Sequence, residues 1–301
     1  MALPSIDLSG PLTSDKRLLY RFNASYQNFG SFIEFVNGEN ISISPVLSYE
    51  ISNDTTLTFR YEYSRYNRIF YEGIPINYTG DRNIDNFILS ELPISRNLGE
   101  PSDRVRGISH IANFRLEHRF NDNLTLKTAF GAAFLDGRTG AFRSFFLNPE
   151  TLDASRFYRT VKESATNYSS QTDLIAKFNT GSVGHQLLLG LEYTYSFSDS
   201  LFRTSNTENP SLINIFNPIY GAPIPQTFPD GFGGPTSSNA VGVYLQDQVT
   251  LLSNLKLLIG GRYDFLSESS KSGFLTSQKK TFGLARFGMI QLIHCPNCSR
   301  G

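Results

Sequence analysis

The most reactive side chains in this sequence are two cysteines close to its C-terminal end. Cys295 and Cys298, in the stretch CPNC, are the only cysteines in the chain. A Cys-x-x-Cys pair is typical of a redox centre or of half a zinc site. Structural zinc needs four ligands, and His294 is the only further candidate beside the pair. We therefore interpret the pair as accidental and predict no metal site and no cofactor.

Acidic and basic side chains that alternate along the chain are a second candidate for chemistry, as acid–base pairs. No GxSxG, P-loop or HExxH motif accompanies them, so we expect no enzyme. The 27 basic and 27 acidic residues cancel, and no overall field favours nucleic acid as a partner. We interpret these side chains as the lining of a water-filled lumen, with the following polar members: Arg60, Glu62, Arg115, Glu117, Gln246, Gln248, Arg262 and Asp264.

The elements that carry these side chains are predicted strands. In residues 241–265, VGVYLQDQVTLLSNLKLLIGGRYDF, apolar and polar residues alternate on both sides of the short turn at Ser253 and Asn254. Period-two alternation across a tight turn predicts a β-hairpin with one apolar and one polar face. On this interpretation Val243, Leu245, Leu257 and Ile259 meet lipid. The pattern recurs along the whole chain and predicts about ten to twelve strands and little helix.

The connections between these strands alternate in length. Short turns at one end and long loops at the other are typical of outer-membrane barrels, whereas soluble sandwiches, the alternative, mix their loop lengths. We therefore predict an all-β fold, an antiparallel transmembrane β-barrel with short periplasmic turns and long extracellular loops. The short turns centre near residues 13, 53, 122, 182 and 253, and the long connections cover 30–40, 67–107, 135–166, 198–240 and 267–280.

Several stretches also resemble one known family. The hairpin GVYLQDQVTLLSNLKLLIGGRYD at 242–264 closely resembles a signature of TonB-dependent ferric-siderophore receptors of the ferrichrome type, and its style is nearest to cyanobacterial members. IDLSGPLTSDKRLLYRFNASYQNFGSF at 6–32, SPVLSYEISNDTTLTFRYEY at 44–63 and TDLIAKFNTGSVGHQLLLGLEY at 172–193 resemble other barrel hairpins of that family. The resemblance covers roughly residues 5–290.

This resemblance implies a protein of the outer membrane that imports ferric siderophores with energy from the TonB-ExbB-ExbD system. It implies a 22-stranded barrel around an N-terminal plug, with a TonB box. Neither plug nor TonB box is recognisable here, nor is a signal peptide. We expect residues 1–290 to be a partial barrel and 291–301 an aberrant tail read out of frame. Such a fragment is expected to be unable to insert into the membrane or transport alone.

Ligand contacts are expected in the long loops, where aromatic rings suit the organic shell of a siderophore. The same rings could instead pack against one another to close the loops. Two alternatives stay open: a passive porin-like small barrel, and an outer-membrane enzyme barrel, for which no convergent catalytic set is evident. The loop candidates are Tyr71, Tyr78, Arg82, Phe216, Tyr220 and Phe228.

Overall fold

The computed structural model describes residues 2–73, 82–205, 208–252, 255–271 and 278–294. It consists of twelve antiparallel strands and one short helix. The strands are β1 (Ser5–Pro11), β2 (Leu18–Gly30), β3 (Asn37–Ser52), β4 (Thr55–Arg68), β5 (Arg104–Asn121), β6 (Leu124–Leu147), β7 (Asp153–Thr180), β8 (Val183–Thr204), β9 (Ser211–Asn214), β10 (Phe232–Leu252), β11 (Leu255–Ser270) and β12 (Gln278–His294), and the helix is α1 (Arg82–Glu91).

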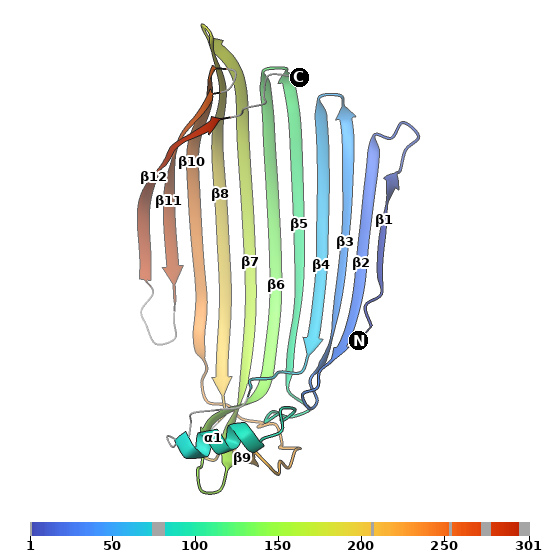
Figure 1. Ribbon diagram of the computed structural model, residues 1–301, viewed down its shortest axis with the longest axis vertical. Helices are drawn as coiled ribbons and strands as arrows, with labels where there is room; N and C mark the ends of the chain where they lie inside the picture. Colours follow the sequence, from blue (N-terminus) through green and yellow to red (C-terminus); the bar gives the residue numbers. More distant parts are fainter. Residues whose placement is uncertain (1, 74–81, 206–207, 253–254, 272–277, 295–301) are drawn as a thin grey trace.

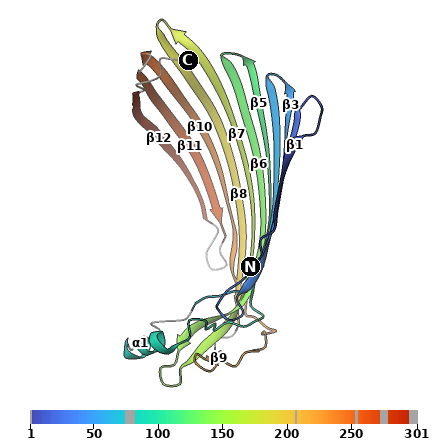
Figure 2. The same cartoon turned by 45° about the vertical axis from the view of Figure 1, so that its right-hand side comes forward.

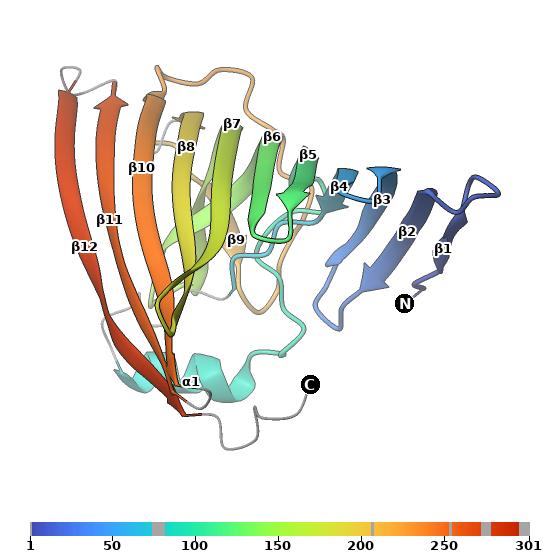
Figure 3. The ribbon, with the colours of Figure 1, turned by 90° about the horizontal axis from the view of Figure 1, so that it is seen from above.

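The strands form a single meander in which each strand pairs with the next along the chain. The order is β1 to β8, then β10, β11 and β12, while β9 pairs with the end of β7. Seen from above, the strands follow an arc from β1 to β12 (Figure 3). Within the described residues β1 pairs only with β2 and β12 only with β11, so the sheet is open between them. The predicted all-β antiparallel sheet of ten to twelve strands is confirmed.

The two ends of the sheet differ as the sequence predicted. Two-residue turns join β3 to β4, β5 to β6 and β7 to β8, and Gly181 takes a positive φ of 64° in the last of these. At the opposite end lie α1, β9 and the connections that join β2 to β3, β4 to β5 and β8 to β10, which we call the loop cap (Figures 1 and 2). No helix in the described part of the chain is long and apolar enough to cross a membrane.

The extent of the long connections is where the sequence prediction was wrong. Residues 135–166, expected to be a loop, are mostly strand, because β6 runs to Leu147 and β7 starts at Asp153. The expected loop 198–240 likewise contains the end of β8, all of β9 and the start of β10, and α1 interrupts 67–107. In these extensions neighbouring loops cover the strands, so one uniformly apolar face is not required and the alternation fades.

The register of the ladder divides the sheet into two faces. Phe59, Phe114 and Phe130 are direct cross-strand partners, and the same row continues to Tyr193 and Val241. We call this side the apolar face and the other the polar face. Side chains of the apolar face are widely exposed, including Leu47, Phe59, Phe114, Phe130, Leu189, Leu191, Val243, Leu245, Ile259 and Phe265. The buried apolar side chains of the described residues instead all lie between Ile69 and Ile215, at or near the loop cap.

Candidate functional site

The loop cap has a small hydrophobic core of its own. Ile88 lies on α1, and Leu92 directly follows the helix and donates its backbone N–H to the Ile88 carbonyl at 3.0 Å. The two side chains are therefore one turn apart and face the same direction. They pack against the ends of the strands and the neighbouring connections, so that a helix of ten residues is held by tertiary contacts. The remaining buried members of this cluster are Leu98, Leu147, Ala154, Ile213 and Ile215, with Leu152, Phe216 and Tyr220 packed against them.

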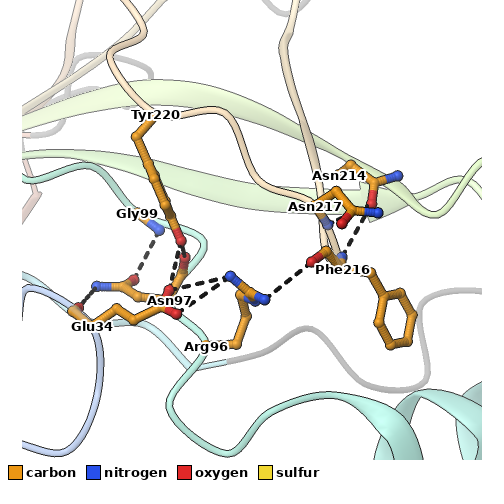
Figure 4. Close-up of polar contacts among 8 residues, drawn as sticks. All are labelled: Glu34, Arg96, Asn97, Gly99, Asn214, Phe216, Asn217 and Tyr220. Carbon is orange, nitrogen blue, oxygen red and sulfur yellow. Dashed lines mark hydrogen bonds and ion pairs between the residues drawn. The ribbon is translucent and has the colours of Figure 1, made fainter.

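Three connections of the cap meet in a polar cluster around Glu34, which we call the clasp (Figure 4). Arg96 places Nη1 at 3.3 Å from Glu34 Oε2 and donates from Nη2 to the carbonyl of Phe216 at 3.1 Å. Asn97 donates from Nδ2 to the carbonyl of Glu34 at 2.9 Å. The Tyr220 hydroxyl lies 2.8 Å from both Glu34 Oε2 and the Asn97 carbonyl. Each connection thereby fixes the position of the other two.

Tyr220 is the member of the clasp that reaches furthest across the cap. Burial, with the neighbouring Glu34 carboxylate, raises the pKa of Tyr220 to about 12, so the hydroxyl stays protonated and donates. Its ring packs edge-on against Phe35, with the ring centroids 4.8 Å apart. Its sequence separation from Glu34 is 186 residues. This contact therefore depends on the complete fold.

Replacing Tyr220 by Phe removes the hydroxyl and keeps the ring. A hydrogen bond to a charged group contributes about 1.5–3 kcal/mol. We therefore expect the free energy of local opening of the 215–221 segment to fall by that amount. Hydrogen exchange of its backbone amides measures the change. Tyr193→Phe is the matched control, because the Tyr193 hydroxyl donates to Asn239 on the sheet at 3.0 Å, away from the cap. Equal protection in Y220F and wild type would contradict the role given to the clasp.

A buried ion pair fastens the cap to β7, and we call it the anchor. The side chains of Arg156 and Glu100 are each 1% exposed, with Nη2 and Oε1 2.9 Å apart. Arg156 also donates to the Leu98 carbonyl at 2.8 Å and to Ser211 Oγ at 3.0 Å. Glu100 Oε2 accepts the backbone N–H of Gly221 at 2.7 Å. One pair of side chains thus joins two connections, β7 and β9.

Asp103 completes the attachment of the cap at the start of β5. Its carboxylate accepts the backbone N–H of Glu100 at 2.8 Å and that of Phe142 at 3.1 Å. Burial raises the pKa of Asp103 to about 6, and the two backbone hydrogen bonds offset this only in part. The folded chain therefore binds a proton at this group between about pH 4 and pH 6, where the unfolded chain has already released it.

The sign of the resulting pH dependence follows from the raised pKa. Where the folded state holds more protons than the unfolded state, stability falls as the pH rises. The Asp103 carboxyl therefore lowers the free energy of unfolding as the pH rises from about 4 to about 6. We expect Asp103→Asn to remove this part of the pH dependence of the urea midpoint. Glu150→Gln, at an exposed position in the 148–152 connection, is the control and should leave it unchanged. An unaltered profile in D103N would show that another group is responsible.

The ligand candidates whose side chains the structure describes each have their own contacts. Phe216 and Tyr220 belong to the clasp, and Phe216 also packs against Phe87 with centroids 5.6 Å apart. The ring centroids of Phe228 and Tyr158 are 6.2 Å apart. The Tyr71 side chain is partly buried. Tyr78 lies outside the described residues, and Arg82 is placed only as the first residue of α1. The structure thus shows loop aromatics that close the loops.

The charged residues of the clasp and the anchor were missed from the sequence. Glu34, Arg96 and Glu100 fall in stretches predicted only as long loops, and Arg156 falls in the supposed loop that proves to be β7. A usable signal was the run Asn-Leu-Gly-Glu-Pro-Ser-Asp at 97–103, where turn-forming residues surround one Glu. The partners of Glu100 lie 56 and 121 residues away in sequence and could not be identified without the fold.

The polar face carries a second group of charges. Starting from the pair Arg60 and Asn113, the register places all eight residues predicted to line the lumen on this one face. Arg262 bonds Glu192 at 2.7 Å and Asp264 at 2.7 Å, and its guanidinium lies 5.3 Å from the centre of the Tyr244 ring. An open hollow of about 380 Å³ lies on this face, lined by residues that include Arg60, Arg115, Glu117, Gln171 and Glu192.

An antiparallel meander with one exposed apolar face, one charged face, short turns at one end and fastened loops at the other is the architecture of an outer-membrane receptor barrel. The sequence model described as "TonB dependent receptor-like, beta-barrel" matches residues 47–288. The chain therefore belongs to the family of TonB-dependent receptor β-barrels, whose members are proteins of the outer membrane, as its sequence indicated.

Individual relatives agree with this assignment. The metal-pseudopaline receptor CntO of Pseudomonas aeruginosa is 31% identical over 268 residues, which are 86% of this chain and 36% of that protein. The ferrichrome outer membrane transporter/phage receptor of Escherichia coli is 21% identical, over 88% of this chain and 38% of that protein. The crystal structure of BauA, the ferric preacinetobactin receptor of Acinetobacter baumannii, superposes with a TM-score of 0.81 at 18% identity, over 98% of this chain and 43% of that one. The chain thus spans little more than a third of the length of these curated relatives.

Proposed function

We propose that this chain contributes to the TonB-dependent uptake of ferric siderophores through the outer membrane, as part of the wall of a receptor barrel. The supporting observation is the 31% identity with a metal-chelate receptor across 86% of the chain. Energy would come from the TonB-ExbB-ExbD system, a proposal supported by the TonB dependence in the family's name. In this proposal the apolar face contacts lipid, the polar face borders the lumen and the loop cap lies on the extracellular side.

The cap supports a role in capture because its loops are held in defined positions. A ligand that meets ordered loops loses less conformational freedom on binding than one that must order them. Of the six proposed contact residues, Phe216 and Tyr220 already hold the loops together. In our proposal they support the binding surface, while Tyr71, Phe228, Tyr78 and Arg82 remain proposed as contacts.

Binding of a ferric chelate can be tested through tyrosine fluorescence. The chain contains 15 tyrosines and no tryptophan, so a ferric complex bound at the cap should quench tyrosine emission. Ferrichrome and ferrioxamine B are the probes, with their iron-free forms as controls, in detergent-solubilised protein. Saturable quenching by at least one ferric complex supports the proposal. In cells, deletion of the gene should lower uptake of the radiolabelled complex in a TonB-dependent manner. Uptake unchanged by the deletion would refute the proposal.

A further inference from the structure

Near the turn end of the sheet, the polar face is hollowed between β7 and β11. The hollow measures about 440 Å³, and two cations line it, Lys177 close to the end of β7 and Lys256 close to the start of β11. Its other polar lining residues include Asn179, Gln186, Gln248 and Thr250, and none of the described residues that line it is acidic. We call this place the rim hollow.

The two lysines of the rim hollow have no ion-pair partner within the described residues. Asp173, four residues before Lys177 on β7, accepts hydrogen bonds from two other side chains of the polar face. Asp247 on β10 lies on the apolar face, where its Oδ2 is 2.7 Å from Nδ1 of His185. Both carboxylates are therefore engaged elsewhere, and the positive charge of Lys177 and Lys256 can be complemented by an anion from outside the chain.

The remaining polar groups of the rim hollow can donate hydrogen bonds to such an anion. Gln186 and Gln248 are direct cross-strand partners in the row of Lys177, and each carboxamide carries two N–H donors. Thr250 is the partner of Lys256 and adds a hydroxyl. Within the described part of the chain these three side chains make no hydrogen bond of their own. The lining therefore suits an anion with several oxygen acceptors.

The spacing of the two lysines indicates the kind of anion that fits. Lys177 and Lys256 are three strand-to-strand steps apart, from β7 through β8 and β10 to β11, at about 4.8 Å a step. Their register rows differ by two residues, which adds about 7 Å along the strands, so the Cα atoms are about 16 Å apart. Each four-carbon side chain reaches about 6 Å. The two ammonium groups therefore suit a ligand with two separated negative groups better than one compact anion.

We infer that Lys177 and Lys256 form a binding subsite for organic anions with two or more separated carboxylates, at the periplasmic mouth of the lumen. The inference rests on the proposed function, because that proposal makes the polar face the lumen wall and the turn end the periplasmic side. A ferric chelate with free carboxylates would meet this subsite after leaving the loop cap. Lysine contributes a flexible point charge, and the site is open, so the ligand is held weakly and can leave again, as passage through a lumen requires.

Equilibrium dialysis of radiolabelled suberate against the detergent-solubilised full chain tests this subsite. Suberate carries a carboxylate at each end of its chain, and the comparison probe is its monoamide, which has the same chain and one carboxylate. One ion pair in water favours binding by about fivefold, so we expect suberate to bind about fivefold more tightly than the monoamide. Removing either lysine, in K177Q or K256Q, should abolish that difference.

Two further variants make the result specific. K177R/K256R keeps both charges and should retain the preference for suberate. R115Q/K127Q removes two other cations of the polar face, both of which already contact Glu117, and should retain it as well. Equal binding of the two probes by the wild-type chain would overturn the inference. Equal loss of the preference in K177Q and R115Q/K127Q would also overturn it, because the whole charged face would then act and not the rim hollow.

Failure of the inference can be told apart from failure of the proposed function. TonB-dependent uptake that is lost on deletion of the gene, together with equal binding of the two probes, overturns only the inference. If uptake is unchanged by the deletion, the proposed function falls, and the role of the subsite in passage falls with it, even where suberate is preferred. Loss of uptake on deletion combined with a preference for suberate that depends on both lysines supports the two together.

Discussion

Replacing Glu100 by Gln is expected to release the loop cap from the strands. The carboxylate is the one acidic group bonded to Arg156 among the described residues, and both side chains are buried. Removing one partner of a buried pair leaves an uncompensated charge and typically costs about 3–5 kcal/mol. The bond from the Gly221 amide to Glu100 weakens as well. Hydrogen exchange in 96–103 and 211–221 should therefore accelerate strongly, while the amides at the centre of β7 and β8 keep their protection.

Two comparison variants make this result specific. Asp54→Asn breaks the pair of Asp54 and Arg119, whose side chains are about half exposed, and solvent screening should leave little measurable change. Adding Arg156→Met to Glu100→Gln removes the uncompensated charge, and protection should partly return. Equal exchange in E100Q and wild type would show that the pair does not hold the cap. Loss of protection throughout the sheet would show that the cap and the strands unfold together.

Strand positions and the assignment of side chains to faces were predictable because they depend on a local rule. In the membrane-spanning part of the sheet each face meets one uniform medium, so a period of two survives along β10 and β11. The observed register places side chains on the faces predicted from the sequence, even at positions as distant as Arg60 and Asp264. The polar residues His118 and Asp247, which interrupt the apolar face, lie near its turn end.

The cap was unpredictable for the opposite reason. Its strand extensions are covered by loops, so their side chains follow the shapes of specific neighbours and no single medium sets a pattern. The two Nη atoms of the buried Arg156 donate to Leu98, Glu100 and Ser211, and no local rule indicates an arginine with such partners. The helix α1 likewise depends on contacts with distant residues. The contacts of the candidate site could therefore be identified only from the fold, whereas the strands of the barrel wall could be predicted from the sequence.

The assignment of the two faces leads to a second prediction with a large expected effect on stability, which concerns Val243→Arg. Val243 is 43% exposed on the apolar face, and its direct partners are Leu191 and Tyr263. Its row continues to Thr172 on β7, midway between Phe178 near the turn end and Thr166 in the row of Tyr63 and His110. At about 2.6 Å of height per residue, Phe178 to Thr166 spans about 31 Å, close to the roughly 30 Å hydrocarbon core, so Thr172 lies near the centre of the apolar face. An arginine at the bilayer midplane costs about 2–4 kcal/mol in barrels. In the receptor barrel of which we propose this chain forms part, folded into phosphatidylcholine vesicles, the urea midpoint should fall accordingly.

Gln246→Arg is the matched control, because Gln246 lies on the same strand and on the polar face. An arginine there has access to water and should change the midpoint little. The contrast depends on which side meets lipid, since the two positions lie three residues apart on the same strand and receive the same substituent. If both variants lose the same stability, the apolar face is not the lipid face. If Q246R alone is destabilised, the two faces are reversed.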